Sequence, residues 1–205
     1  TIVTLTPTAD LGWTFDSWSG LDAGDLVDNG DGTWNIIMDE NKMITATFAV
    51  SCIDVLNENF DGASPPSGWS SGGNKNEWHW GKCRGGPGYR NAHSGENCYG
   101  TDMQGKDYKY ENLANCYIRT GWIDLSSFSS ATLEFYDWYI VEDEGHQYDK
   151  VYLEINDGSW HILDTFSGSG STAQDSWTLK SYDLSSYVGG HIQIQWRLVS
   201  SNWVR

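Results

Sequence analysis

The chain has few basic residues and no long apolar stretch. Its 205 residues include 12 Lys and Arg against 28 Asp and Glu, which gives a formal net charge of −16. Binding to nucleic acid is disfavoured because contact with a polyphosphate requires a basic surface. An anionic membrane surface would repel the chain for the same reason. No apolar run approaches the roughly 20 residues of a membrane-spanning helix, so the sequence predicts no insertion into a bilayer.

The short motifs of the common enzyme classes are missing as well. The sequence contains no H-E-x-x-H, no G-x-S-x-G, no phosphate-binding loop and no dinucleotide-binding glycine pattern. The five histidines are scattered, and no two stand at the i, i+4 spacing of a helical zinc-binding pair. We therefore expect no catalytic residues in this chain. Any catalytic domain of the parent protein would lie outside it.

Residues 1–50 show no helical periodicity, and the composition of the whole chain, rich in aromatic and turn residues, indicates few long helices. Twelve Trp and 11 Tyr can cover a large core, and 23 Gly indicate many turns. Several short segments alternate apolar and polar side chains, as half-buried strands do. Examples are Leu133 and Phe135, and then Val151, Leu153 and Ile155. The sequence predicts an all-β fold.

The strand-like segments fall into two groups, residues 1–50 and 51–205, which we predict to be two β domains. In the first, Asp28–Gly32 predicts a hairpin turn because Asn and Gly accept a positive φ. A second hairpin turn is expected at Asp39–Lys42. In the second domain, nine strand-like segments, beginning with Asp54–Phe60, indicate a sandwich or jelly roll. Because strand patterns reach almost to both ends, we expect the chain to be a piece of a longer one.

The four cysteines are Cys52, Cys83, Cys98 and Cys116. None of them forms a Cys-x-x-Cys pair, which disfavours a zinc knuckle or a thioredoxin-like site. Their even number in an acidic β chain is typical of an oxidising compartment. The sequence does not choose among the three pairings that four cysteines allow. A bond between Cys83 and Cys98 would close a glycine-rich loop, and four free buried thiols are the alternative.

Two stretches of the first domain carry a family resemblance. They are G-W-T-F-D-S-W-S-G at residues 12–20 and D-E-N-K-M-I-T-A-T-F at residues 39–48. Through them, residues 1–50 resemble the divergent internalin B-type repeat, a small β-grasp-like module of bacterial and archaeal surface proteins. The first strand that this family usually has is missing, so the resemblance implies a truncated repeat.

A second resemblance covers residues 54–205. Its main stretches, in order, are N-F-D-G at 59–62, E-W-H-W-G at 77–81, H-S-G-E-N-C-Y-G-T at 93–101 and I-Q-I-Q-W-R-L at 192–198. They resemble the MAM-like jelly roll that accompanies secreted metallopeptidases of the immune inhibitor A type and related adhesins. The resemblance implies an extracellular location, secreted or at the cell surface. The closing strand typical of this family is missing here.

The second resemblance also implies a structural Ca²⁺ site. It places residues 57–61 and 94–97 together at the edge of the jelly roll, with Asp61 and Glu96 on the acidic positions of the family and Glu58 as the third candidate ligand. Calcium takes about six to eight oxygen ligands, and these carboxylates would supply part of that set. The alternative is that Glu58 and Asp61 only cap a turn.

Aromatic residues near the expected loops are candidates for stacking on a glycan. They are Trp69, Trp78, Trp80 and Tyr89. Jelly rolls commonly present exposed rings to sugars. The alternative is that most of the Trp residues are core rings, and the sequence does not show which are exposed.

These observations predict a non-catalytic extracellular adhesion or spacer segment of a larger cell-surface or secreted protein, with a structural calcium ion. The alternative is a carbohydrate-binding accessory domain of a secreted protease or glycosidase. A third hypothesis follows from the missing strands, because neighbouring copies could complete each other and form a filament. The expected partners are the other domains of the parent protein, a surface glycan or protein, or further copies of the chain, and not nucleic acid.

Overall fold

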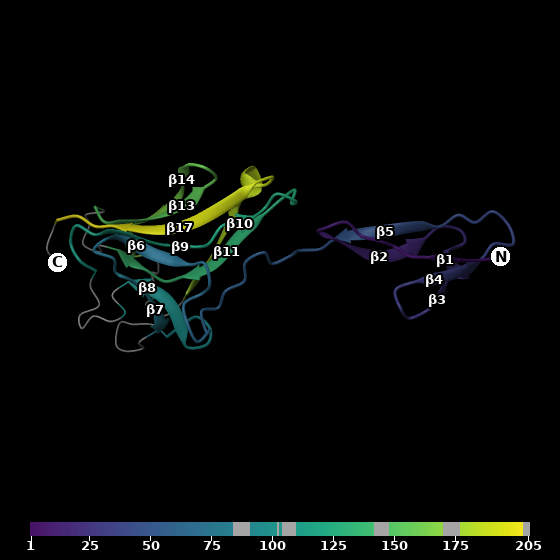
Figure 1. Cartoon of the computed structure of the whole chain (residues 1–205), viewed down its shortest axis with the longest axis horizontal. Coiled ribbons are helices and arrows are strands. Elements are labelled where there is room, and N and C mark those ends of the chain that lie inside the picture. The colour runs from purple at the N-terminus through teal and green to yellow at the C-terminus, as the bar shows by residue number, and fades with distance from the viewer. Residues whose placement is uncertain (84–90, 102, 104–109, 142–147, 170–176, 203–205) are drawn as a thin grey trace. The chain divides into compact units, whose positions relative to one another are not determined.

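The computed structural model describes residues 1–83, 91–101, 103, 110–141, 148–169 and 177–202 (Figure 1). The chain divides into two compact units, Thr1–Asp54 and Val55–Arg205. The regular structure is β apart from two short 3-10 turns, η1 (Ala23–Asp25) and η2 (Ser185–Tyr187), so the all-β prediction is confirmed. Within the described residues there is no helix with the length and apolar character needed to cross a membrane.

The first unit contains two small antiparallel sheets. In one, β4 (Trp34–Ile37) pairs with β1 (Ile2–Leu5) and with β3 (Val27–Asp28). In the other, β2 (Trp13–Ser19) pairs with β5 (Thr45–Val50). Aromatic rings join the two sheets, because the ring of Trp34 in β4 lies 5.1 Å from that of Phe15 and 5.7 Å from that of Trp18, both in β2.

The turn between β3 and β4 agrees with the prediction for Asp28–Gly32, and the N–H of Asn29 donates to the carbonyl of Thr33 at 3.0 Å. The second hairpin, expected at Asp39–Lys42, is wrong because the strands on its two sides belong to different sheets. Alternation shows which face a strand buries, but it does not show which strand is its neighbour.

The second unit is built on one antiparallel sheet in the order β14-β13-β17-β9-β6, with β10 also paired to β17 (Figure 1). We call it the main sheet. Its strands are β6 (Ser70–Asn74), β9 (Asn115–Arg119), β10 (Ile123–Asp124), β13 (Lys150–Asn156), β14 (Trp160–Phe166) and β17 (His191–Val199). The last of these strands is central, since it pairs with β13 on one side and with β9 on the other.

Three further antiparallel pairs complete this unit. They are β11 (Thr132–Asp137) with β16 (Thr178–Asp183), β12 (Ile140–Val141) with β15 (Gly168–Ser169), and β7 (Trp78–Lys82) with β8 (Asn97–Thr101). The core lies between the main sheet and the β11–β16 pair, where Leu153, Ile155 and Ile194, all at most 2% exposed, pack with Leu133 and Phe135. This arrangement is a β-sandwich, whereas the MAM-like jelly roll stays a prediction.

The strand expected at Asp54–Phe60 is not formed, although the segment is described throughout. Side-chain oxygens take the local backbone donors instead. Glu58 Oε1 accepts from the N–H of Phe60 at 2.6 Å, and Asn59 Oδ1 accepts from the N–H of Asp61 at 3.1 Å. Such local bonds compete with strand pairing, and they leave Phe60 at a positive φ of 63°.

Candidate functional site

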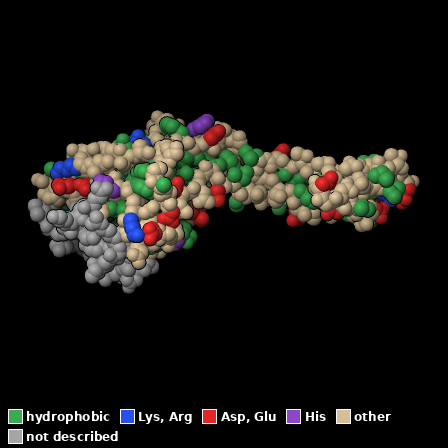
Figure 2. Space-filling model, turned by 60° about the horizontal axis from the view of Figure 1, so that its bottom comes forward, with side chains coloured by type: hydrophobic (Ala, Val, Ile, Leu, Met, Phe, Trp, Pro, Cys, Tyr) green, Lys and Arg blue, Asp and Glu red, His purple; other side chains and the backbone are tan. Residues whose placement is uncertain are grey.

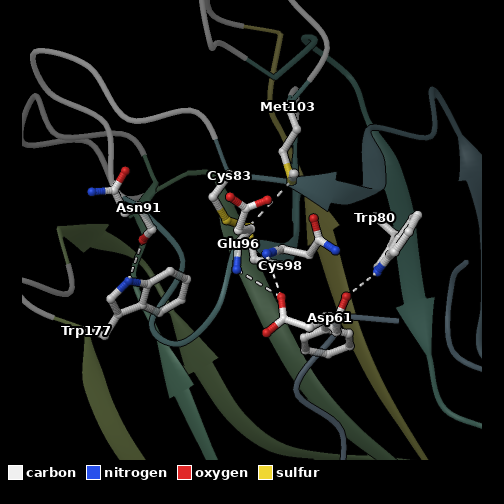
Figure 3. Close-up of a disulfide and its surroundings, with 10 residues drawn as sticks. Asp61, Trp80, Cys83, Asn91, Glu96, Cys98, Met103 and Trp177 are labelled. Atoms are coloured by element: carbon white, nitrogen blue, oxygen red, sulfur yellow. Dashed lines mark hydrogen bonds between the residues drawn. A yellow bond between two sulfur atoms is a disulfide. The ribbon is translucent and has the colours of Figure 1, made fainter. Parts of the chain in front are cut away.

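A disulfide between Cys83 and Cys98 links the end of β7 to β8 (Figure 3). The backbone closes around it, because the N–H of Cys83 donates to the carbonyl of Glu96 at 3.0 Å. One of the bonds that the sequence left open is therefore present. Of the other two cysteines, Cys52 is exposed and Cys116 is buried, and both are free thiols.

Removing this disulfide tests how much the fold depends on it. We expect the double substitution Cys83→Ser and Cys98→Ser to lower the free energy of unfolding of the second unit by about 3 kcal/mol. The reason is that the bond, with a sequence separation of 15, restricts the unfolded chain. Thermal melting followed by circular dichroism measures the effect, with Cys52→Ser as the control. Identical melting of the double variant and the parent chain would contradict this expectation.

Asp61 lies beside the disulfide and holds the start of β8 through backbone hydrogen bonds (Figure 3). Its Oδ1 accepts from the N–H of Glu96 at 2.9 Å and from that of Asn97 at 3.0 Å. These bonds lower the pKa of Asp61 below its ordinary value of 3.8. The close approach of the Asp61 carboxylate to this backbone requires glycine at position 95. Gly95 has φ +57°, and a Cβ there would collide with the carboxylate. We call this contact the Asp61 clasp.

The lowered pKa makes the clasp dependent on pH. Its contribution to stability is complete above the ordinary carboxyl pKa and is lost as the pH falls through the lower pKa of the folded state. We expect Asp61→Ala to lower the melting temperature at pH 6 and to have a progressively smaller effect as the pH falls below the ordinary carboxyl pKa. Melting of both proteins across that range is the measurement. A deficit that stays the same at every pH would show that the charge of Asp61 is not what stabilises the fold.

Gly95→Ala tests the same contact from the other side. We expect a cost of about 1–2 kcal/mol from the left-handed backbone alone, with a further cost from the collision. Asp61→Ala removes the colliding carboxylate, so the double variant should lose less stability than the sum of the two single variants. Simple additivity would mean that the two side chains do not meet.

The three carboxylates predicted to bind calcium are each engaged with protein groups. Asp61 forms the clasp, Glu58 bonds within its own loop, and Glu96 Oε1 lies 3.0 Å from Lys82 Nζ. In the described part of the chain, no three His, Cys, Asp or Glu side chains stand together in a way that could hold a metal. As they are placed, these residues do not fit a calcium site, and calcium binding stays a prediction.

The calcium prediction has a direct test. Because Asp61 Oδ1 already accepts two N–H groups, this arrangement implies the same melting temperature in excess calcium and in chelator, whereas the calcium prediction requires a higher one in calcium. A melting temperature that calcium raises, and that Glu96→Gln returns to the value in chelator, would contradict this expectation and support the ion.

The rings predicted to stack on glycans have partners inside the second unit. Trp69 has two other aromatic rings at 6.1 Å, Trp78 packs against the small core cluster around Cys116, and Trp80 Nε1 donates to a backbone carbonyl at 2.8 Å. Tyr89 lies outside the described residues. The structure therefore gives Trp69, Trp78 and Trp80 roles in packing, and glycan stacking by these four residues stays a prediction.

A partly buried carboxylate pair, Asp137 and Asp164, lies where the β11–β16 pair meets β14. Burial raises the pKa of Asp137 to about 6, although Lys180 opposes the shift. Asp164 Oδ2 accepts from the hydroxyl of Tyr182 at 2.6 Å. A raised carboxyl pKa is a feature of acid–base catalysts, but internal ion-pair networks produce it too. Here the partners come from both layers, so the cluster links the layers of the sandwich.

The side of the main sheet that faces away from the core carries long planar side chains. We call it the outer face. In β17, for example, Ile194 and Trp196 pack in the core while Gln195 and Arg197 point the other way. The planar side chains of the outer face are Tyr117, Arg119, Tyr152, Glu154, Trp160, Gln195 and Arg197.

Four of these side chains form one hydrogen-bonded chain across β9, β17 and β13. Arg119 donates to Gln195 Oε1 from Nε at 3.1 Å and from Nη2 at 2.6 Å. Gln195 Nε2 donates to Glu154 Oε2 at 2.5 Å, and Arg197 donates to both oxygens of Glu154 at 2.6–3.2 Å. Glu154 and Gln195 are only 4% and 3% exposed, because the longer neighbours on this face cover them.

Two aromatic rings flank Arg119 on this face. The guanidinium carbon lies 3.9 Å from the centre of the Tyr117 ring and 5.0 Å from the centre of the Trp160 ring. Tyr117 leans over Gly72 of β6, where a Cβ would come within 2.9 Å of its hydroxyl. A glycine at position 72 therefore leaves the room that this ring occupies.

The first unit is similar to a known family of bacterial repeats. Residues 1–52 match the divergent InlB B-repeat domain family. This match covers β1 to β5, so the resemblance of the first domain is confirmed. The stretch that matches this family is a unit of two small sheets joined by aromatic rings.

Over 141 residues the chain is also 34% identical to Bacillopeptidase F of Bacillus subtilis (strain 168). The similarity spans 68% of this chain but only 9% of that relative. Most of the matched stretch lies beyond the InlB B-repeat, because the first unit ends at Asp54. The MAM-like resemblance of the second unit is not confirmed by these matches.

The sequence pattern alone does not single out the outer face. A signal exists in V-Y-L-E-I at residues 151–155 and I-Q-I-Q-W-R-L at residues 192–198, where the polar partners of the core residues are themselves aromatic or planar. However, nothing in the sequence places β13 beside β17 and β17 beside β9.

Proposed function

We propose that this chain is a non-catalytic accessory segment of a larger extracellular protein, secreted or held at the cell surface. The observation that carries the proposal is the similarity to a small part, 9%, of a much longer peptidase. The InlB B-repeat match at residues 1–52 supports it from the other unit.

The disulfide supports the extracellular location. Bonds of this kind form and persist in oxidising compartments and are rare in the cytosol. The Cys83–Cys98 bond joins two paired strands, so it is part of the folded framework of the second unit.

The accessory role is tested with the purified, oxidised chain and a labelled casein substrate. We expect no hydrolysis above the blank, because an accessory segment folds stably but does not itself catalyse a reaction. Limited proteolysis of the same sample should leave the two units intact. Hydrolysis that copurifies with the chain and disappears on substitution of one of its side chains would overturn the proposal.

A further inference from the structure

The outer face holds an arginine, Arg119, whose charge is not paired with a carboxylate of any described residue. Among the described residues, Arg119 contacts only the neutral amide of Gln195 and the rings of Tyr117 and Trp160. By contrast, Arg197 on the same face forms a salt bridge with Glu154 at 2.6 Å. The chain carries 28 acidic and 12 basic side chains, and acidic residues are scattered over the surface shown in Figure 2. Among the described residues no carboxylate lies within ion-pair distance of the Arg119 guanidinium, so this group is available to a single carboxylate of a ligand although the chain as a whole is acidic.

The guanidinium is held in a defined orientation. Gln195 accepts from Nε and from one N–H of Nη2, and Gln195 is itself fixed by Glu154. This leaves Nη1 and the second N–H of Nη2 without an acceptor in the part of the chain that the structure describes. Arginine binds carboxylates through two parallel N–H groups of this kind. Because its neighbours already orient the group, little entropy is lost when it binds.

An exposed aromatic ring lies next to this guanidinium. Trp160 is 39% exposed, and its ring centre lies 5.0 Å from the guanidinium carbon. Ile162, on the same strand, is 59% exposed. An indole ring offers an apolar face and a polar edge, which match the apolar face and the hydroxyl edge of a sugar ring.

We propose that the outer face binds an acidic polysaccharide, with Arg119 holding a sugar carboxylate and Trp160 stacking on a sugar ring. Tyr117 and Gln195 position Arg119, while the Glu154–Arg197 pair holds Gln195 in place. The inference names what the accessory segment binds and therefore rests on the proposed function. It uses none of the residues Trp69, Trp78, Trp80 and Tyr89.

The test is binding of the intact chain to polygalacturonate, measured by calorimetry and by affinity electrophoresis. The matched probe is the same polymer with its carboxylates methyl-esterified. We expect saturable binding to polygalacturonate, at least about tenfold weaker binding to the esterified polymer, and loss of affinity as salt rises, because ions screen an exposed charge pair.

The variants locate the site. Arg119→Gln should weaken binding about tenfold or more, since a charge-assisted hydrogen bond is lost. Arg119→Lys keeps the charge but lacks the two parallel N–H groups of the guanidinium, so its affinity should lie between that of Arg119→Gln and that of the parent chain. Trp160→Ala should weaken binding about tenfold by the same scale.

Two control variants remove similar groups at other places. Lys82→Gln removes an exposed positive charge elsewhere in the second unit, and Trp13→Ala removes an exposed indole from the first unit. Neither control should change the affinity.

Several results would overturn the inference. They are absence of binding by a chain with normal melting, equal affinity for the acidic and esterified polymers, and affinity unchanged by Arg119→Gln or Trp160→Ala. These results would overturn only the binding of an acidic polysaccharide. The accessory role is tested separately by the casein assay, so a failure of one claim can be told apart from a failure of the other.

Discussion

Replacing Ile155 by Ala is expected to lower the free energy of unfolding of the second unit by about 2–5 kcal/mol. Ile155 is fully buried and lies on β13, opposite Ile194 of β17. It belongs to the core cluster that packs against Leu133 and Phe135 of the second layer. Truncation removes apolar contacts and leaves a cavity between the two layers. Urea unfolding followed by tryptophan fluorescence measures the change.

The matched control is Ile162→Ala on the adjacent strand β14. Ile162 is 59% exposed, so the same chemical change should cost no more than about 0.5 kcal/mol. If the two variants lost equal stability, the assignment of the inner and outer faces of the main sheet would be wrong.

Replacing Glu154 by Gln is the second change with a large expected effect. Glu154 is 4% exposed and accepts hydrogen bonds from Arg197 and Gln195. The hydrogen bonding to Glu154 raises the pKa of Arg197. Glutamine has nearly the same shape but no charge, so Arg197 would lose its only carboxylate partner among the described residues. Breaking a buried ion pair in this way costs about 3–5 kcal/mol, and partial exposure of Arg197 places the expected value at the lower end.

A double variant that removes both charges of the Glu154–Arg197 pair isolates the contribution of the ion pair. Glu154→Leu combined with Arg197→Met leaves no buried charge, so the double variant should be more stable than Glu154→Gln alone. Urea unfolding of both proteins measures this. A double variant less stable than Glu154→Gln would show that the network stabilises through its packing and not through its charges.

The sequence located most of the strands, although the one expected at Asp54–Phe60 is not formed, but it did not show which strands are neighbours. Val151, Leu153 and Ile155 alternate as a half-buried strand must, and this strand is present with Leu153 and Ile155 in the core. Turn chemistry located the turn at Asp28–Gly32. Pairing depends on contacts between distant segments, and for that reason the hairpin at Asp39–Lys42 was wrong.

The contact around Asp61 was likewise predictable from the sequence only in part. The family resemblance placed Asp61 beside residues 94–97, and these segments do meet. The contact uses the N–H groups of Glu96 and Asn97, however, and the Glu96 carboxylate pairs with Lys82. A motif shows that two segments approach each other, but it does not show which atoms meet.

The outer face depends entirely on the order of strands. Arg119 and Gln195 are 76 residues apart and Gln195 and Glu154 are 41 apart. Each is an ordinary polar residue in its own strand. Their common network appears only when β9, β17 and β13 lie side by side.

Binding at the outer face can be observed residue by residue in a titration of isotope-labelled chain with polygalacturonate, followed by nuclear magnetic resonance. We predict that the indole N–H signal of Trp160 and the Nε–H signal of Arg119 shift together and saturate. The indole signal of Trp13 in the first unit should not move. Unmoved signals from Trp160 and Arg119, in a sample where other signals shift and saturate, would contradict the proposed binding surface.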